Sequence, residues 1–193
     1  LTCSNAGVRD TERTLLGELA TLLAKPVGAL LAPLRPTLLA PLLARPLRSL
    51  PLLTQVAVIE AVGYCLKQQV SEGDELLPLD EQLLRLLGEA LYTADADELP
   101  RDRGRMLGLH IRGVSLEVRL RVVCIELLCA AMSHEGIKQP QRAELRNRMI
   151  AAFFKCLTVR HEEVVDASRD ALAKVIIAQQ KLQKELLQSS LRP

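Results

Sequence analysis

The residues of this chain best suited to bind a metal are two cysteines and a histidine that lie close together, Cys124, Cys129 and His134. On an α-helix a step of five residues turns a side chain by about 500°, so the two sulfurs point in different directions. A zinc site needs four converging ligands and usually contains a Cys-x-x-Cys pair, which this stretch lacks. Cysteines in apolar stretches are commonly buried as small side chains. The spacing therefore favours core packing over metal binding.

The other two histidines, His110 and His161, lie at predicted loop or helix-terminus positions, without a serine or cysteine nucleophile at an interpretable spacing. His161 comes directly before Glu162 and Glu163 at a predicted helix start. Capping and the helix dipole account for such a group at that position. Neither histidine therefore predicts catalysis.

An acidic and glycine-rich stretch follows one of the predicted helices. Its three acidic residues lack the spacing and the glycine turn of a calcium-binding loop, so a solvated helix end is expected. Its three glycines do not follow a strand, as phosphate-binding glycines do. These residues are Asp95, Asp97, Glu98, Gly104, Gly108 and Gly113. We predict no catalytic, cofactor-binding or metal-binding residue, no small-molecule substrate and no enzyme activity.

Four basic residues lie along one predicted helix, and two of them, Arg142 and Arg146, are neighbours on its surface. The other two are Lys138 and Arg148. No aromatic residues are interleaved with them, as they are in many nucleic-acid-binding surfaces. The net charge of +2 is too small to attract nucleic acid or an anionic membrane to the whole molecule. A solvated face is favoured, and no direct nucleic-acid binding is expected.

The composition predicts an all-α protein. Of 193 residues, 49% are hydrophobic, 25% charged and 2% aromatic, so the chain should fold around an aliphatic core. Leucine and alanine favour helices, and the β-branched or aromatic runs that mark strands are nearly absent. Five scattered cysteines indicate a reducing compartment, the cytosol or nucleus. The chain starts with Leu1 and shows no signal peptide, and we expect it to be a fragment of a longer protein.

Amphipathic periodicity predicts six helices and the opening of a seventh. The predicted ranges are 11–24, 52–69, 79–96, 115–133, 140–158, 161–178 and 181–191. Ser115 is the expected N-cap of one helix, and Pro140 is expected at the start of another. The predicted apolar face of the 140–158 helix consists of Ile150, Phe153, Phe154 and Leu157.

Residues 26–53 form a leucine-rich stretch that contains six prolines. Proline fits the first turn of a helix but breaks its interior, so we expect two or three short helices joined by tight bends. Residues 27–44 are apolar enough to suggest a membrane span. However, Arg35 lies in the middle, and each proline would leave backbone groups unsatisfied in lipid, so a buried helical hairpin is favoured. Residues 97–114 lose the helical periodicity and are expected to be a loop or insertion.

Two helices share a pattern typical of HEAT repeats: a valine, then small residues, then aliphatic residues. The pattern starts at Val118 and again at Val164, and a spacing of 46 residues lies within the usual HEAT period. Small residues let the helices of a pair approach closely, while leucine and valine fill the seam to the next pair. We predict that residues 1–193 form a single segment of a HEAT-like, armadillo-like helical solenoid, with the clearest helix pairs in 115–193.

Several stretches resemble, in order, the helical-solenoid region of the TRRAP family, the very large pseudokinase scaffolds related to phosphatidylinositol-kinase-like kinases. They are LLAPLLARPLRSLPLLTQVAVIEAVGYCL (38–66), DEQLLRLLGEALYTADADE (80–98), LRVVCIELLCAAM (120–132), IAAFFKCLTVRHEEVVDASRDALAKVI (150–176) and QQKLQKELLQSSLRP (179–193). The Arg-Pro-Leu-Arg segment, the Tyr64-Cys65-Leu66 helix and the C-terminal Leu-Arg-Pro are the more distinctive parts. Residues 99–114 depart from the family pattern, and no family binding residue maps onto a position here.

The resemblance implies a scaffold segment of a nuclear, chromatin-associated coactivator, a subunit of histone acetyltransferase complexes of the SAGA and MYST kinds. Such proteins provide docking surfaces for transcription activators and for other complex subunits. Their kinase-like domain has lost catalytic residues and lies outside this piece. Repeat geometry alone leaves open a HEAT-repeat adaptor in transport or kinase regulation. A small helical enzyme, the third alternative, would need a polar pocket with shifted titratable groups.

Overall fold

The chain is all-α, as predicted. The computed structural model describes residue 3 and residues 5–68, 76–96 and 115–190, and every regular element within these ranges is helical. The side chains of residues 6, 38 and 181–190 are outside this description. The predicted loop or insertion at 97–114 also lies outside the described residues, together with Asp97, Glu98, His110 and the three glycines between 104 and 113.

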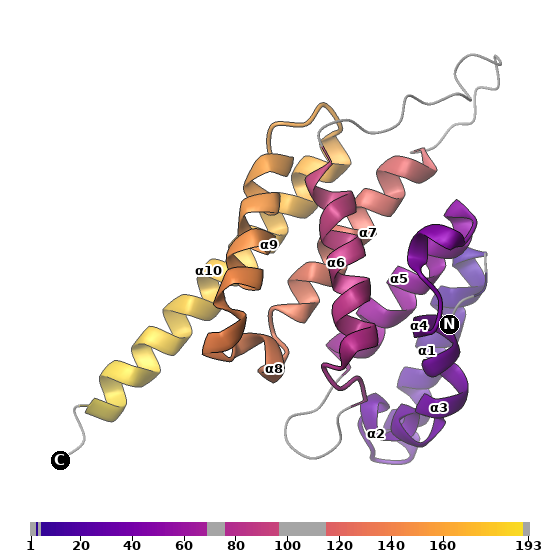
Figure 1. Cartoon of the computed structure of the whole chain (residues 1–193). Helices are drawn as coiled ribbons and strands as arrows, with labels where there is room; N and C mark the ends of the chain where they lie inside the picture. The colour runs from indigo at the N-terminus through magenta and orange to yellow at the C-terminus, as the bar shows by residue number, and fades with distance from the viewer. Residues whose placement is uncertain (1–2, 4, 69–75, 97–114, 191–193) are drawn as a thin grey trace.

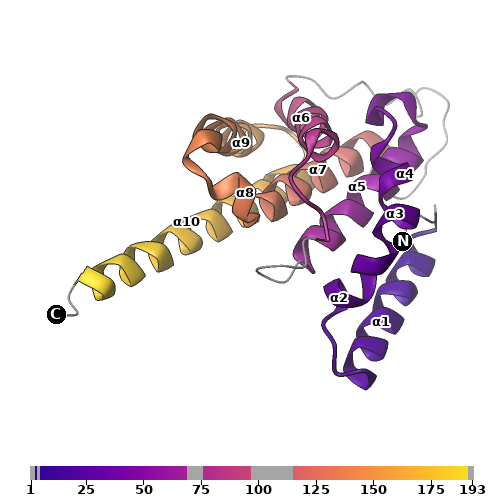
Figure 2. The ribbon, with the colours of Figure 1, turned by 60° about the horizontal axis from the view of Figure 1, so that its bottom comes forward.

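The main body consists of two layers of helices (Figure 1, Figure 2). One layer contains α5 (Leu52–Lys67), α7 (Leu116–Ala131) and α10 (Glu162–Ser190), and α7 packs against both of the others. The second layer contains α6 (Glu81–Asp95) and α9 (Ala143–Cys156), which pack against each other. Across the layers α6 contacts α7, and α9 contacts α10. Helix pairs stacked side by side in this way are the architecture of a HEAT-type solenoid.

The core lies between the layers and is mainly aliphatic, with one fully buried phenylalanine. Ile59, Leu87, Ile125 and Phe153 come from four different helices, and each is 0% exposed. Burial of a large apolar side chain contributes about 1.5–3 kcal/mol each. The apolar periodicity of four helices therefore converges on one continuous core.

The leucine- and proline-rich stretch forms five short helical segments. They are α2 (Val27–Leu31), η1 (Ala32–Leu34), α3 (Arg35–Leu38), α4 (Ala40–Leu43) and η2 (Leu47–Ser49). Prolines occupy the first turn of η1, α3 and α4. A backbone N–H at that position has no acceptor within the helix, so its absence in proline costs no helical hydrogen bond. Leu31, Leu39, Leu43 and Leu47 are at most 6% exposed, so these segments are anchored to the core through leucines.

Two side chains of α6 hold these short helices in place. Leu47 N–H, at the start of η2, donates to Glu89 Oε2 at 2.6 Å. Arg85 Nη2 donates to the carbonyl of Leu43, at the end of α4, at 2.5 Å. A carboxylate thus meets a helix N-terminus and a guanidinium meets a helix C-terminus, and each completes backbone hydrogen bonds that a short helix leaves open.

None of the described helices is both long enough and apolar enough to cross a bilayer by itself. Residues 7–22 and 27–37 would reach that length and composition only together, and they are bent by 104° relative to each other.

Polar side chains cap several helices, and the predicted N-cap is among them. Ser115 Oγ accepts from Val118 N–H at 3.3 Å, which confirms that α7 starts where the sequence indicated. Asp80 caps α6 in the same way through Leu83 N–H at 2.9 Å. His134 caps the short helix α8 (Glu135–Lys138), which the sequence did not predict.

Three sequence predictions need correction. Pro140 opens a separate turn, η4 (Pro140–Arg142), and α9 begins only at Ala143. Phe154 was predicted on the apolar inner face of that helix but is 56% exposed, because it directly follows Phe153 and so lies about 100° around the helix. Finally, α10 continues through the predicted break at 179–180, since Gln179 and Gln180 are good helix formers.

Candidate functional site: a charged groove between α1, α5 and α7

A buried carboxylate joins three helices at one end of the stack. Glu60 lies on α5, and its side chain is 7% exposed. Its Oε2 accepts from Arg9 of α1 (Ala6–Leu22), with Nε at 3.0 Å and Nη2 at 2.7 Å. Its Oε1 accepts from Arg119 Nη2 of α7 at 2.5 Å. Both oxygens are therefore satisfied by guanidinium groups, the strongest type of donor for a carboxylate.

The pKa of Glu60 reflects two opposing effects. Burial raises it, but hydrogen bonds and charges from Arg119 and Arg9 outweigh burial, so the pKa lies below its ordinary value of 4.5. Glu60 is consequently ionised near neutral pH and acts as a fixed negative charge between two arginines.

Arg13 is the least well satisfied arginine of this cluster. Its Nη2 is 3.8 Å from Glu60 Oε2, and its Nη1 is 3.4 Å from Asp10 Oδ1. Its guanidinium carbon lies 5.4 Å from the centre of the Tyr64 ring, a cation–π contact. Its Nε–H is buried and has no hydrogen-bond partner among the described residues. Arg13 therefore retains donor capacity.

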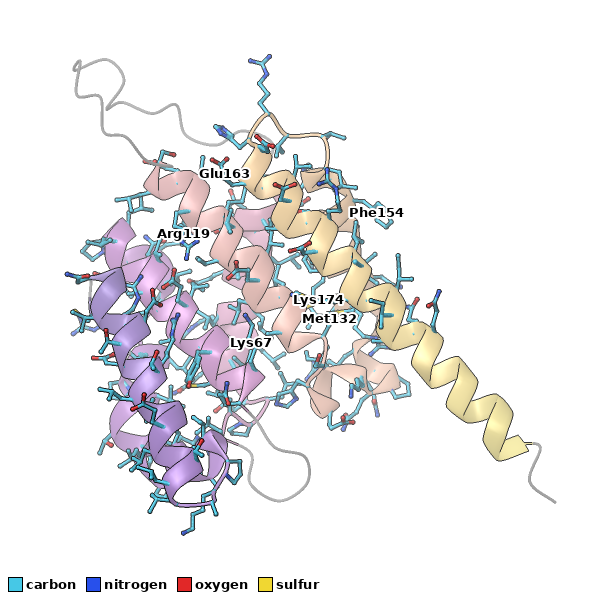
Figure 3. The ribbon with its side chains drawn as sticks, turned by 180° about the vertical axis from the view of Figure 1, so that it is seen from behind. Lys67, Arg119, Met132, Phe154, Glu163 and Lys174 are labelled. Atoms are coloured by element: carbon cyan, nitrogen blue, oxygen red, sulfur yellow. The ribbon has the colours of Figure 1, made fainter. Side chains whose placement is uncertain are left out.

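Next to this cluster lies an open groove of about 90 Å³. Its apolar lining comes from α5 and α7, and its charged lining comes from all three helices. The apolar residues are Ile59, Gly63, Val123 and Leu127, and the polar and charged ones are Arg13, Glu60, Tyr64, Lys67, Arg119 and Glu126. Lys67 and Arg119 are seen on the same face in Figure 3, where α1, α5, α7 and α10 face the viewer. An apolar floor with a mainly cationic rim suits contact with another protein's side chains.

The three candidate metal ligands of the sequence do not converge. Burial raises the pKa of the Cys124 thiol to about 12, although Thr93 hydrogen-bonds to it. Cys129 Sγ faces the carbonyl of Ala171 at 4.0 Å, and burial raises its pKa as well. No group of three or more His, Cys, Asp or Glu side chains in the described part of the chain could hold a metal ion.

His134 has a structural position at the end of α7. Its Nδ1 accepts from Gly136 N–H at 3.0 Å, so its Nε2 carries the hydrogen and donates to the carbonyl of Leu77 at 2.9 Å. The ring is buried and connects the segment before α6 to α8. His161 is exposed, and its carbonyl accepts from Val164 and Val165 at the start of α10.

The predicted basic stripe is not a uniform solvated face. Arg146 Nη1 donates to the carbonyls of Ile137 and Gln139 at 2.5 and 2.7 Å, so it holds the end of α8. Lys138 pairs with Glu135 one turn away at 2.6 Å. Arg148 is exposed, and Arg142 is half-buried. Asp95, predicted at a solvated helix end, is exposed and pairs with Lys155 at 3.2 Å.

One buried charge was missed by the sequence analysis. Arg121 of α7 is 1% exposed, and its Nε and Nη2 donate to the carbonyl of Ala94 at 3.1 and 2.7 Å. Cys156 Sγ donates to the same carbonyl at 3.1 Å. Arg121 thus completes the C-terminal end of α6 and joins α6, α7 and α9. The burial of Arg121 could have been predicted from its position on an apolar helix face, three residues after Val118 and four before Ile125.

These stacked helix pairs place the chain in the class of HEAT-type helical-repeat proteins. Residues 1–193 match the Tra1 HEAT repeat ring region. The chain belongs to the Tra1/TRRAP family, as the resemblance in the sequence had indicated.

Three relatives show how far the similarity extends. The chain is 37% identical over 190 residues, 98% of its length, to the SAGA complex/NuA4 acetyltransferase complex subunit Tra1 of Schizosaccharomyces pombe. It is 31% identical over all 193 residues to the corresponding subunit, TRA1, of Saccharomyces cerevisiae. It is 32% identical over 168 residues, 87% of its length, to a probable transcription-associated protein 1 of Dictyostelium discoideum. It covers only 4–5% of the length of these relatives.

Proposed function

We propose that this chain is a non-catalytic scaffold segment of a transcription coactivator, a histone acetyltransferase complex subunit, and that it acts through protein–protein interaction. The observation that supports this most strongly is the family match along the entire chain. Two relatives that it matches over 98–100% of its length are named as subunits of the SAGA and NuA4 acetyltransferase complexes. The partners we propose are other subunits of such a complex and transcription activators, and the proposed location is the nucleus.

The ionisable side chains best suited to chemistry, among those described, make contacts that hold the structure together. Glu60 joins three helices, Arg121 completes the end of α6, and His134 connects two segments. Burial keeps the thiols of Cys65 and Cys124 protonated at neutral pH, with pKa values of about 11 and 12. These contacts support a scaffold, in which polar groups fix the positions of helices.

The groove beside Glu60 is the surface that we propose for partner contact. Charged rims surrounding a small apolar centre are typical of non-obligate protein interfaces. Arg13 and Lys67 supply positive charge at the rim. The Nε–H of Arg13 has no hydrogen-bond partner among the described residues, so it remains able to donate. Charge at such a rim mainly steers association and selects partners.

The test uses the full-length protein that contains this segment, captured from nuclear extract and analysed by mass spectrometry. We expect acetyltransferase subunits to be recovered. Recovery of none would overturn the proposed function.

Two charge-reversal variants then test the groove. Lys67→Glu changes an exposed lysine at the groove rim, whereas Arg148→Glu makes the same charge change on exposed surface of α9. We expect Lys67→Glu to reduce recovery of at least one subunit several-fold and Arg148→Glu to leave it unchanged. Equal recovery with both variants would show that the groove is not a contact site.

A further inference from the structure

Helix α1 presents most of its large apolar residues away from the rest of the molecule. Val8, Leu15, Leu19 and Leu22 are 42%, 57%, 44% and 82% exposed. The buried residue of α1, among those whose side chains are described, is Arg9, at 4%. This is the reverse of the usual arrangement, in which a surface helix turns its apolar face to the core.

The exposed residues form one continuous stripe. At about 100° per residue, positions 8, 15, 19 and 22 fall within about 60° of one another around the helix axis. We call these four residues the α1 stripe. A stripe that narrow and that apolar is typical of a helix packed against another helix.

The side of α1 that faces the body is attached mainly by polar contacts. Arg9 binds Glu60 and also donates to the carbonyl of Cys3, and Arg13 lies over Tyr64. Leu16 is the partly buried apolar residue of α1 that packs against the core. In Figure 3, α1 lies along α5 at the outer edge of the layer. The aliphatic core therefore gives way to a polar layer between α5 and α1.

We infer that the α1 stripe packs against a helix of the same polypeptide outside this segment, so that α1 forms an interface with a neighbouring part of the solenoid. The chain covers only 4–5% of the length of its relatives and belongs to a repeat ring region, in which each helix pair contacts neighbours on both sides. This inference rests on the family membership and does not require the proposed partner function.

The charge beside the stripe indicates what kind of helix covers it. At about 100° per residue, the exposed Glu18 lies on one flank of the stripe, while Arg9 and Arg13 lie on the side that faces the body. The covering helix should therefore be apolar, with a basic residue on the flank that meets Glu18.

Cysteine labelling tests this inference in the purified full-length protein. Leu19→Cys places a thiol in the stripe, and Thr14→Cys places one at an exposed position of the same helix away from the stripe. In the isolated segment we expect maleimide to label both positions at similar rates. In the full-length protein we expect labelling at position 19, followed by peptide mass spectrometry, to slow at least ten-fold relative to position 14.

Three results would overturn the inference. Equal labelling of both variants in the full-length protein would mean that the stripe is open to solvent. Protection that occurs only in the isolated segment and rises with its concentration would assign the stripe to a second copy. Protection that appears only after assembly with other subunits would assign it to one of those subunits. Because the readout is accessibility within the purified protein, it is independent of whether acetyltransferase subunits are captured.

Discussion

Helices α7 and α10 begin with the same sequence pattern and lie next to each other in one layer, but they are buried to very different extents. In α7, ten of 16 residues are buried. In α10, five of the residues 162–180 are buried, and the last of them is Val175. Beyond that residue α10 extends away from the other helices (Figure 1, Figure 2). The difference arises from position in the stack, since α7 lies between α5 and α10 and is backed by α6.

One pair of equivalent positions illustrates this difference in burial. Ala131 of α7 and Ile177 of α10 are 46 residues apart, the same offset that relates Val118 to Val164. Ala131 is 1% exposed, whereas Ile177 is 64% exposed. A small residue stands where helices approach closely, and a large apolar residue stands where no described element covers the helix. Equivalent positions in a repeat therefore predict where a helix starts, while burial depends on the neighbours.

The largest expected effect compares a truncation in each helix. Leu128→Ala removes a side chain that is 0% exposed in α7 and should reduce the free energy of unfolding by about 2–5 kcal/mol. Ile176→Ala removes one that is 51% exposed in α10 and should change it by less than about 0.5 kcal/mol. Urea unfolding of the segment at low concentration, followed by circular dichroism, measures both. Equal losses would show that the end of the stack is as tightly packed as its centre.

The next effect concerns the buried charge of α7. Arg121→Lys keeps the charge but cannot reproduce two hydrogen bonds from one planar group to the Ala94 carbonyl. We expect a loss of about 2–3 kcal/mol in unfolding free energy, because the ammonium group stays buried with fewer partners. Arg121→Met, which also removes the charge, should cost less. The two variants are compared by the same urea unfolding measurement, and a smaller loss for lysine than for methionine would contradict this account.

The local features of this fold could be predicted from sequence, because short-range chemistry determines them. The Ser115 cap and the breaks at the prolines follow from residue type and neighbours alone. The Glu60 cluster could not be predicted, because Arg9 and Arg119 are 51 and 59 residues away along the chain. The side of the molecule toward which the α1 stripe faces could not be predicted from the sequence either. Leu15 and Leu19 indicate a helix with an apolar face, but which neighbour covers that face is a property of tertiary structure.

A smaller effect tests how α7 is held at its start, where Arg119 binds Glu60. Because the pKa of Glu60 is lowered by folding, its stabilising contribution is complete above the ordinary value of 4.5 and is lost as the pH falls below that value. Glu60→Gln should cost about 1–2 kcal/mol at neutral pH through loss of charged hydrogen bonds. It should also reduce the dependence of stability on pH below about 4.5.

Urea unfolding at a series of pH values measures this dependence. Glu126→Gln, which removes an exposed carboxylate from the same groove, is the control and should leave the acid dependence close to that of the unsubstituted chain. An unchanged acid dependence in Glu60→Gln would show that the arginines do not bind the ionised carboxylate in solution.

The smallest expected effect is that of an asparagine substitution at the other end of α7, where His134 connects α8 to the segment before α6. Asparagine is a good N-cap and can keep the hydrogen bond to Gly136 N–H, but its side chain is too short to reach the Leu77 carbonyl. His134→Asn should therefore cost about 0.5–1.5 kcal/mol in unfolding free energy, and His134→Ala should cost about 1 kcal/mol more. Hydrogen exchange at the Gly136 amide separates the two contacts. We expect its protection to be kept in the asparagine variant and reduced in the alanine variant, and equal protection in both would mean that the ring does not cap α8.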